Sequence, residues 1–186
     1  MTIAPSISVE RLTVFTKTDL ADLCDAADSA IQAGGGFGWV RPPPRHVFES
    51  YWKGTLLVPE RQLFVGRLDG TIAASAQMAR PARNNEAQAF SAILMTSFVA
   101  PWARGHGLAK LVTVAVEDAA RASGAQLINL DIRETQTAAI QLYETLGYTR
   151  WGVHPRYARV EGKLIRGYYY YKFIDPAAQA AAEAQT

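Results

Sequence analysis

The residues best placed to do chemistry lie within 93–109, where an apolar stretch is followed by a proline and two closely spaced glycines. The apolar residues predict a strand, and Pro101 ends it because proline has no N–H to give to a central ladder. Gly105 and Gly107 then predict a turn into a long helix. A turn that opens a helix leaves several backbone N–H groups without partners at the positive end of the helix dipole. Such a cluster binds anions and suits a pyrophosphate, and Arg104 adds a cation beside it.

Two other phosphate motifs do not fit this stretch. A Walker A loop needs Lys followed by Ser or Thr after its last glycine, whereas Gly107 is followed by Leu108 and Ala109. A dinucleotide fingerprint needs a third glycine where this chain has Lys110. The anion site is therefore of another kind, and an ordinary strand–turn–helix connection stays open as the alternative.

The string from Val99 to Ala109 reads Val-x-Pro-x-x-Arg-Gly-x-Gly-x-Ala, and on it the chain resembles the acyl-coenzyme A loop of the GNAT family of N-acetyltransferases. A second family motif, Leu-x-Val-x-x-x-Asn-x-x-Ala-x-x-x-Tyr-x-x-x-Gly-Phe, is matched by Leu130, Ile132, Gln136, Ala139, Tyr143, Gly147 and Tyr148. Gln136 replaces the usual Asn, which alters one contact to the pantetheine arm. On Leu130-Asp131, the string 152–157 and the Tyr-rich stretch 168–171, the chain further resembles the branch of tabtoxin-resistance and similar small-amine acetyltransferases.

The resemblance implies where acetyl-CoA, the expected co-substrate, is held. The backbone of Phe98 and Val99 takes the pantetheine amides, and the N–H of Val99 faces the acetyl carbonyl oxygen. The pyrophosphate lies on the loop formed by Arg104, Gly105, His106, Gly107, Leu108 and Ala109. No metal is expected.

The expected reaction is direct attack of a primary amine on the thioester, with no acyl-enzyme. Many family members carry a Glu base on the central strand, but 90–99 contains none. Asp131 is the first candidate for the base, and a carboxylate that caps a helix or forms a salt bridge is the alternative. Weaker candidates for the base are His154, Glu86, Glu134 and His46.

Tyr143 is the candidate acid for the departing thiolate, because a phenol stays protonated at neutral pH. It also falls on the apolar face of its predicted helix, so a core tyrosine is the alternative.

These residues need an α/β scaffold to position them. Apolar periodicity predicts strands over 8–15, 63–68, 71–79, 90–99, 126–132, 148–154 and 164–174, and helices over 19–32, 47–56 and 107–123, with a further helix that opens at Thr135 or Thr137 and ends at Gly147. The family implies one GNAT domain over 1–175, with a mostly antiparallel, centrally splayed sheet of about six or seven strands and about four helices. The Ala-rich residues 176–186 predict a frayed helix or a flexible tail.

Composition restricts the class of protein. With 186 residues, 49% of them hydrophobic, and a net charge of +2, the chain predicts a globular domain with no nucleic-acid partner. The single cysteine, Cys24, predicts a buried structural thiol, and having one cysteine fits a reducing cytoplasm. No signal peptide and no membrane span are evident.

Three questions stay open at this stage. Phe37 and Trp39, between three glycines and three prolines in 33–44, predict either a substrate lid or a packed connector. The function is either small-amine acetylation, a non-catalytic acyl-CoA sensor, or acetylation of protein N-termini or lysines. The amine acceptor is not encoded in any motif, and a homodimer is an open alternative to a monomer.

Overall fold

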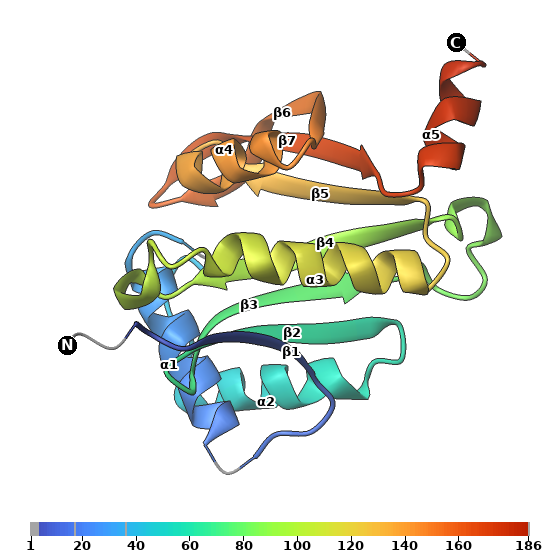
Figure 1. The fold of residues 1–186 in the computed structure, drawn as a ribbon. Helices are drawn as coiled ribbons and strands as arrows, with labels where there is room; N and C mark the ends of the chain where they lie inside the picture. Colours follow the sequence, from blue (N-terminus) through green and yellow to red (C-terminus); the bar gives the residue numbers. More distant parts are fainter. Residues whose placement is uncertain (1–3, 17, 36, 186) are drawn as a thin grey trace. The chain divides into compact units, whose positions relative to one another are not determined.

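A computed structural model describes residues 4–16, 18–35 and 37–185, which form a seven-stranded sheet with flanking helices (Figure 1). The strands are β1 (Ile7–Leu12), β2 (Arg61–Leu68), β3 (Thr71–Ala79), β4 (Ser91–Val99), β5 (Leu127–Arg133), β6 (Thr149–Val160) and β7 (Lys163–Phe173). The helices are α1 (Asp19–Gln32), α2 (Arg45–Leu57), α3 (Leu108–Ala122), α4 (Thr137–Thr145) and α5 (Pro176–Glu183), with short 3₁₀ turns η1 (Glu86–Gln88) and η2 (Pro101–Ala103).

The strands are ordered β1-β2-β3-β4-β5-β7-β6. The pairs β1–β2, β5–β7 and β6–β7 are antiparallel. By contrast, β4 pairs with β5 in parallel, through three residue pairs that end at Ile93 and Asn129. The residues of β4 after Ile93 have no partner in that ladder. The predicted mixed α/β class with a mostly antiparallel sheet is confirmed.

The chain divides into two compact units, and the first comprises Met1–Met78 and Thr96–Val116. Its core is built by the apolar faces of α1 and α2 against β2 and β3, as the helical spacing of small and apolar residues in α1 predicts. Cys24 is fully buried in this core, and burial raises the pKa of its thiol to about 11. The prediction of a buried structural thiol is confirmed.

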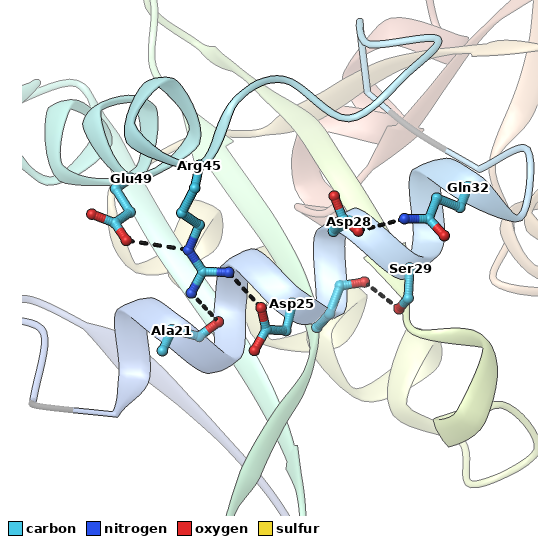
Figure 2. Close-up of polar contacts among 8 residues, drawn as sticks. Ala21, Asp25, Asp28, Ser29, Gln32, Arg45 and Glu49 are labelled. Atoms are coloured by element: carbon cyan, nitrogen blue, oxygen red, sulfur yellow. Dashed lines mark hydrogen bonds and ion pairs between the residues drawn. The ribbon is translucent and has the colours of Figure 1, made fainter.

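Arg45, the first residue of α2, links this helix to α1 (Figure 2). Its guanidinium donates to the carbonyl oxygen of Ala21 over 3.2 Å and to the carboxylate of Asp25, while its Nε donates to Glu49 over 3.2 Å. Both carboxylates are partly exposed to solvent, so these ion pairs add little stability. The two helices are held together chiefly by their buried apolar residues.

The segment between α1 and α2 packs onto this core. The ring of Phe37 lies 5.3 Å from that of Phe98, and the ring of Trp39 lies 4.9 Å from that of Tyr51, measured between centroids. Both side chains are half-buried. Of the two interpretations of 33–44, the packed connector is the one that the described residues form.

The second unit comprises Ala79–Met95 and Glu117–Thr186. Here β5 and β7 align over seven residue pairs, from Leu127 opposite Phe173 to Arg133 opposite Gly167. Glu117, buried near the middle of α3, receives two hydrogen bonds from Lys172 of β7, at 2.8 and 2.9 Å. This pair attaches the second half of α3 to the strand.

Strand β6 is longer than predicted. It runs to Val160 instead of ending at His154, because pairing with β7 resumes at Ala158 after an irregularity. Pro155 lies inside that irregularity, where no ladder hydrogen bond is needed from it. In contrast, β1 is shorter than predicted and ends at Leu12 rather than Phe15.

The Ala-rich tail forms a fifth α-helix, α5, where about four helices were expected. Its start is fixed by Pro176 at the first helical position and by the Asp175 carboxylate, which accepts the N–H of Ala177 over 2.9 Å. Across the described residues, no helix combines the length and the hydropathy that crossing a bilayer requires.

Candidate active site

The predicted anion site is the connection between η2 and α3. Gly105 and Gly107 have φ of +84° and +76°, and a Cβ added to either would meet nothing within 4 Å. The N–H groups of residues 105–110 make no hydrogen bond within the described part of the chain, and the first bond of the helix runs from the N–H of Leu111 to the carbonyl oxygen of Gly107. Several donors and open space therefore meet at the positive end of α3.

His106 braces this loop. Its Nδ1 lies 3.2 Å from the carbonyl oxygen of Ala103 and 3.1 Å from that of Arg104. Both neighbours are acceptors, so Nδ1 carries the proton and donates it. The Arg104 side chain is exposed and forms no ion pair with any described residue, which leaves its guanidinium available to an anion.

The start of α3 is held close to β2. A Cβ at Gly66 would come within 2.9 Å of Leu108 Cδ2 and 3.2 Å of Val112 Cγ1, so a side chain there would force these two residues to shift. Leu108 and Val112 are both buried. This packing fixes the direction in which the first N–H groups of the helix point.

Phe98 and Val99 end β4, beyond its ladder with β5. Phe98 is buried and Val99 is half-buried. Directly after them, the N–H of Ala100 donates to the carbonyl oxygen of Ala73 over 2.8 Å, which fixes the end of the strand on β3. Gln136, the remaining predicted cofactor contact, is the N-cap of α4 and is half-buried.

Asp131 lies exposed on β5 and accepts a hydrogen bond from the hydroxyl of Tyr157. It forms neither an ion pair nor a helix cap with any described residue. Burial and the Asp131 carboxylate both raise the pKa of Tyr157, so this phenol stays protonated and donates. Tyr157 is a partner that the sequence did not assign.

The position of Tyr157 depends on a glycine in β7. A Cβ at Gly167 would overlap the Tyr157 ring, so the ring lies directly over the bare backbone there. Tyr157 falls within the irregular part of β6, between His154 and Ala158. The sequence signal for it was the Pro155 interruption, which marks a place where a side chain can be re-aimed.

Tyr143 is buried in α4, with its ring 5.4 Å from that of Tyr148 in an edge-on arrangement. Burial is common to a core tyrosine and to an acid shielded from water, so both interpretations are compatible with it. The Tyr148 hydroxyl is buried and has no hydrogen-bond partner among the described residues. Its burial and the nearby Glu117 carboxylate raise the pKa of Tyr148.

Of the four weaker candidates for the base, one forms an ion pair and the other three are exposed to solvent. Glu134 pairs with Arg166 over 2.7 Å, and the backbone N–H and guanidinium of Arg166 lower the pKa of Glu134. His154 is exposed and accepts the N–H of Arg156 at Nδ1. Glu86 lies in η1 and His46 in α2, both exposed. The described residues contain no group of three or more His, Cys, Asp or Glu that could hold a metal ion.

A family model and a related sequence both indicate the same protein family. Residues 26–148 match the family model described as the acetyltransferase (GNAT) family. An uncharacterized N-acetyltransferase from Azospirillum brasilense is 68% identical over 130 residues, which are 70% of this chain and 77% of that protein.

Solved structures share the fold at low sequence identity. A candidate acetyltransferase from Salmonella typhimurium, solved with its cofactor acetyl-CoA, aligns with a TM-score of 0.74 and 17% identity over 91% of this chain and 95% of that one. An N-acetyltransferase from Staphylococcus aureus Mu50 aligns with a TM-score of 0.77 and 17% identity over 91% and 99%.

Proposed function

This chain belongs to the acetyltransferase (GNAT) family, and we propose that it takes acetyl-CoA as co-substrate and acetylates the primary amine of a small molecule. The observation that carries the proposal is the loop 104–109, where unpartnered N–H groups, two left-handed glycines and an exposed arginine surround open space. The amine is proposed to attack the thioester directly. The same proposal locates the enzyme in the cytoplasm, which its single cysteine supports.

The loop fits the pyrophosphate of coenzyme A. Its N–H groups are donors on fixed backbone, so they lose little conformational entropy when they bind. Arg104 would add a charge-assisted hydrogen bond, which is stronger than a neutral one. His106 would act indirectly, since its Nδ1 bonds to the carbonyl oxygens of Ala103 and Arg104 and so stabilises the loop.

Two groups of the chain would serve the attack itself. The N–H of Val99 would donate to the thioester carbonyl oxygen as negative charge builds on it. An alkylamine has a reference pKa of about 10.4, so its neutral form at pH 7 costs about 4–5 kcal/mol, and a base at the site would accept the proton that the amine loses. We assign this role to Asp131, whose second oxygen remains available while the first is held by Tyr157.

Tyr143 would assist the departure of coenzyme A. A phenol with a pKa of about 10 is protonated at neutral pH, and a thiol of pKa about 8.5 is a good leaving group. A hydrogen bond that strengthens as charge develops on sulfur lowers the barrier. Burial of Tyr143 excludes water that would compete for this contact.

The missing acidic residue on 90–99 favours a second candidate, a non-catalytic acyl-CoA sensor, because such a protein needs the loop and no base. The two functions are separated by incubating the purified chain with acetyl-CoA and a panel of small amines, amino acids and peptides. Thiol release together with an acetylated small amine, seen by mass spectrometry, supports the proposal. Calorimetric binding of acetyl-CoA without any turnover supports the sensor, and acetylation of peptides alone overturns the small-molecule assignment.

A further inference from the structure

Thr96 has an unusual backbone conformation for a residue inside a strand. Its φ is +53°, and the other non-glycine residues with positive φ in the described chain are Asp69 and Glu161. Those two lie in hairpin turns immediately before a glycine, where left-handed residues are ordinary. Thr96 instead lies within β4 and is β-branched, which makes the left-handed region unfavourable. Its surroundings must therefore hold it there.

The group that holds Thr96 comes from α2. The Tyr51 hydroxyl lies 3.3 Å from Thr96 Oγ1, and the side-chain amide of Gln77 donates to the same hydroxyl over 3.2 Å. Gln77 fills one acceptor position of the Tyr51 oxygen, and either of the two hydroxyls can donate in the contact between Tyr51 and Thr96. Gln77 is completely buried and Thr96 is 8% exposed, so water competes little for these bonds.

Tyr51 is itself fixed by aromatic packing. Its ring lies 4.9 Å from that of Trp39, 5.0 Å from Trp52 and 6.2 Å from Phe37. Phe98 packs on the same cluster, 5.3 Å from Phe37. The hydroxyl is therefore a rigid contact, and the side chains of Thr96 and Phe98 are held by one support.

The conformation of Thr96 decides where the next N–H groups point. In a regular strand successive N–H groups point to opposite edges of the strand. A left-handed residue interrupts this alternation and changes the direction of the N–H groups that follow it. Val99, three residues later, is the donor that the proposed function assigns to the thioester oxygen. We infer that Tyr51, braced by Gln77, is a positioning residue that keeps Thr96 left-handed and so aims the Val99 N–H. This inference rests on the proposed function, and Tyr51 does not touch substrate in it.

A double-mutant cycle tests the inference. Tyr51→Phe removes only the hydroxyl, and Thr96→Gly lets position 96 adopt positive φ without support. With Thr96 present, Tyr51→Phe should lower kcat about tenfold, since an oxyanion donor is misaligned but not removed, while KM for acetyl-CoA stays within about twofold. With glycine at position 96, the same change should lower kcat less than about twofold. Thr55→Val is the matched control, because it removes a buried α2 hydroxyl whose one partner among the described residues is the carbonyl oxygen of Tyr51.

Nuclear magnetic resonance supplies a readout that needs no acceptor amine. Backbone couplings of Thr96 report φ, and they should shift toward extended values in Tyr51→Phe and stay unchanged in Thr55→Val. The Val99 amide resonance should move when acetyl-CoA is added to the wild type, move less in Tyr51→Phe, and recover in the double variant that combines Tyr51→Phe with Thr96→Gly.

The outcomes separate the positioning role of Tyr51 from the proposed function. Thr96 couplings that Tyr51→Phe leaves unaltered overturn the positioning role, as does a loss of kcat that is equally large with glycine at position 96. Absence of both turnover and any Val99 response in the wild type overturns the proposed function. In that case the Thr96 couplings still decide whether Tyr51 holds the left-handed residue.

Discussion

The loop at 104–109 and the Asp131–Tyr157 pair, for which we propose cofactor binding and proton transfer, are built from different groups. The loop presents main-chain donors, whose directions are set by the backbone at Gly105 and Gly107. The pair presents two side chains from β5 and β6, whose meeting depends on Gly167 beneath the Tyr157 ring. The main-chain donors of the loop should survive side-chain changes that preserve its φ angles, whereas the pair is lost with a single oxygen. Cofactor affinity and proton transfer should therefore be separable by mutation.

The largest effect is expected from Gly107→Val. A β-branched residue resists a φ of +76°, and its side chain would fill the space in which we propose the phosphate binds, so acetyl-CoA affinity should fall at least about 100-fold in calorimetry. Gly124→Val is the matched control, because Gly124 has a φ of +80° and equally open surroundings at the opposite end of α3. Unchanged affinity in Gly107→Val, or an equal loss in the control, would remove the loop from the binding site.

Arg104→Ala should have a smaller effect on the same affinity. It removes one charge-assisted hydrogen bond, worth about 1.5–3 kcal/mol or about 10- to 150-fold, and leaves the main-chain donors in place. Its effect should shrink as salt concentration rises, whereas that of Gly107→Val should not. A salt-independent loss in Arg104→Ala would mean that the side chain stabilises the loop rather than contacts phosphate.

Tyr143→Phe tests whether chemistry can be lost while cofactor affinity is kept. It should reduce kcat at least about tenfold and leave acetyl-CoA affinity and melting temperature nearly unchanged, because the ring is retained. Tyr148→Phe is a matched control: it removes the other buried hydroxyl of the same ring pair, which lies near Glu117, so it should leave kcat unchanged. Wild-type kcat in folded Tyr143→Phe, with the true amine, would reduce Tyr143 to a core residue.

The smallest and most pH-dependent effect is expected from Asp131→Asn. Turnover should fall at neutral pH, where the amine is protonated, and recover as pH rises toward the amine pKa of about 10.4. Tyr157→Phe should show the same trend with a lesser loss, since the carboxylate remains but its orientation is freed. A pH–rate profile lowered by one constant factor at every pH would exclude Asp131 as the base.

The loop could be predicted from the sequence because the residues that determine its conformation are neighbours in the chain. Gly105 and Gly107 need positive φ, and the amphipathic residues after them specify where α3 begins. Strands β3 and β5 and helix α4 likewise follow from local periodicity and end signals. For the same reason the family resemblance rested on short strings such as 99–109.

The contacts that escaped prediction are tertiary. Asp131 and Tyr157 are 26 residues apart, and they meet only because β7 pairs with both β5 and β6 and because β6 has an irregularity at Pro155. The residues next to Thr96 in the sequence do not predict a left-handed conformation there, because the side chains that contact or support Thr96 come from α2 and β3. The end of the domain at residue 175, the small-amine branch and the oligomeric state stay predictions.

Every role proposed for this chain depends on the main-chain donors of the loop binding the pyrophosphate of acetyl-CoA. Titrating acetyl-CoA into isotope-labelled protein and following each backbone amide examines that contact without any variant or acceptor. The N–H resonances of residues 105–110 should move downfield, by more than those of the other described loops, and should do so equally in Arg104→Ala once that variant is saturated. Saturation of the protein with these six resonances unmoved would mean that the pyrophosphate binds elsewhere.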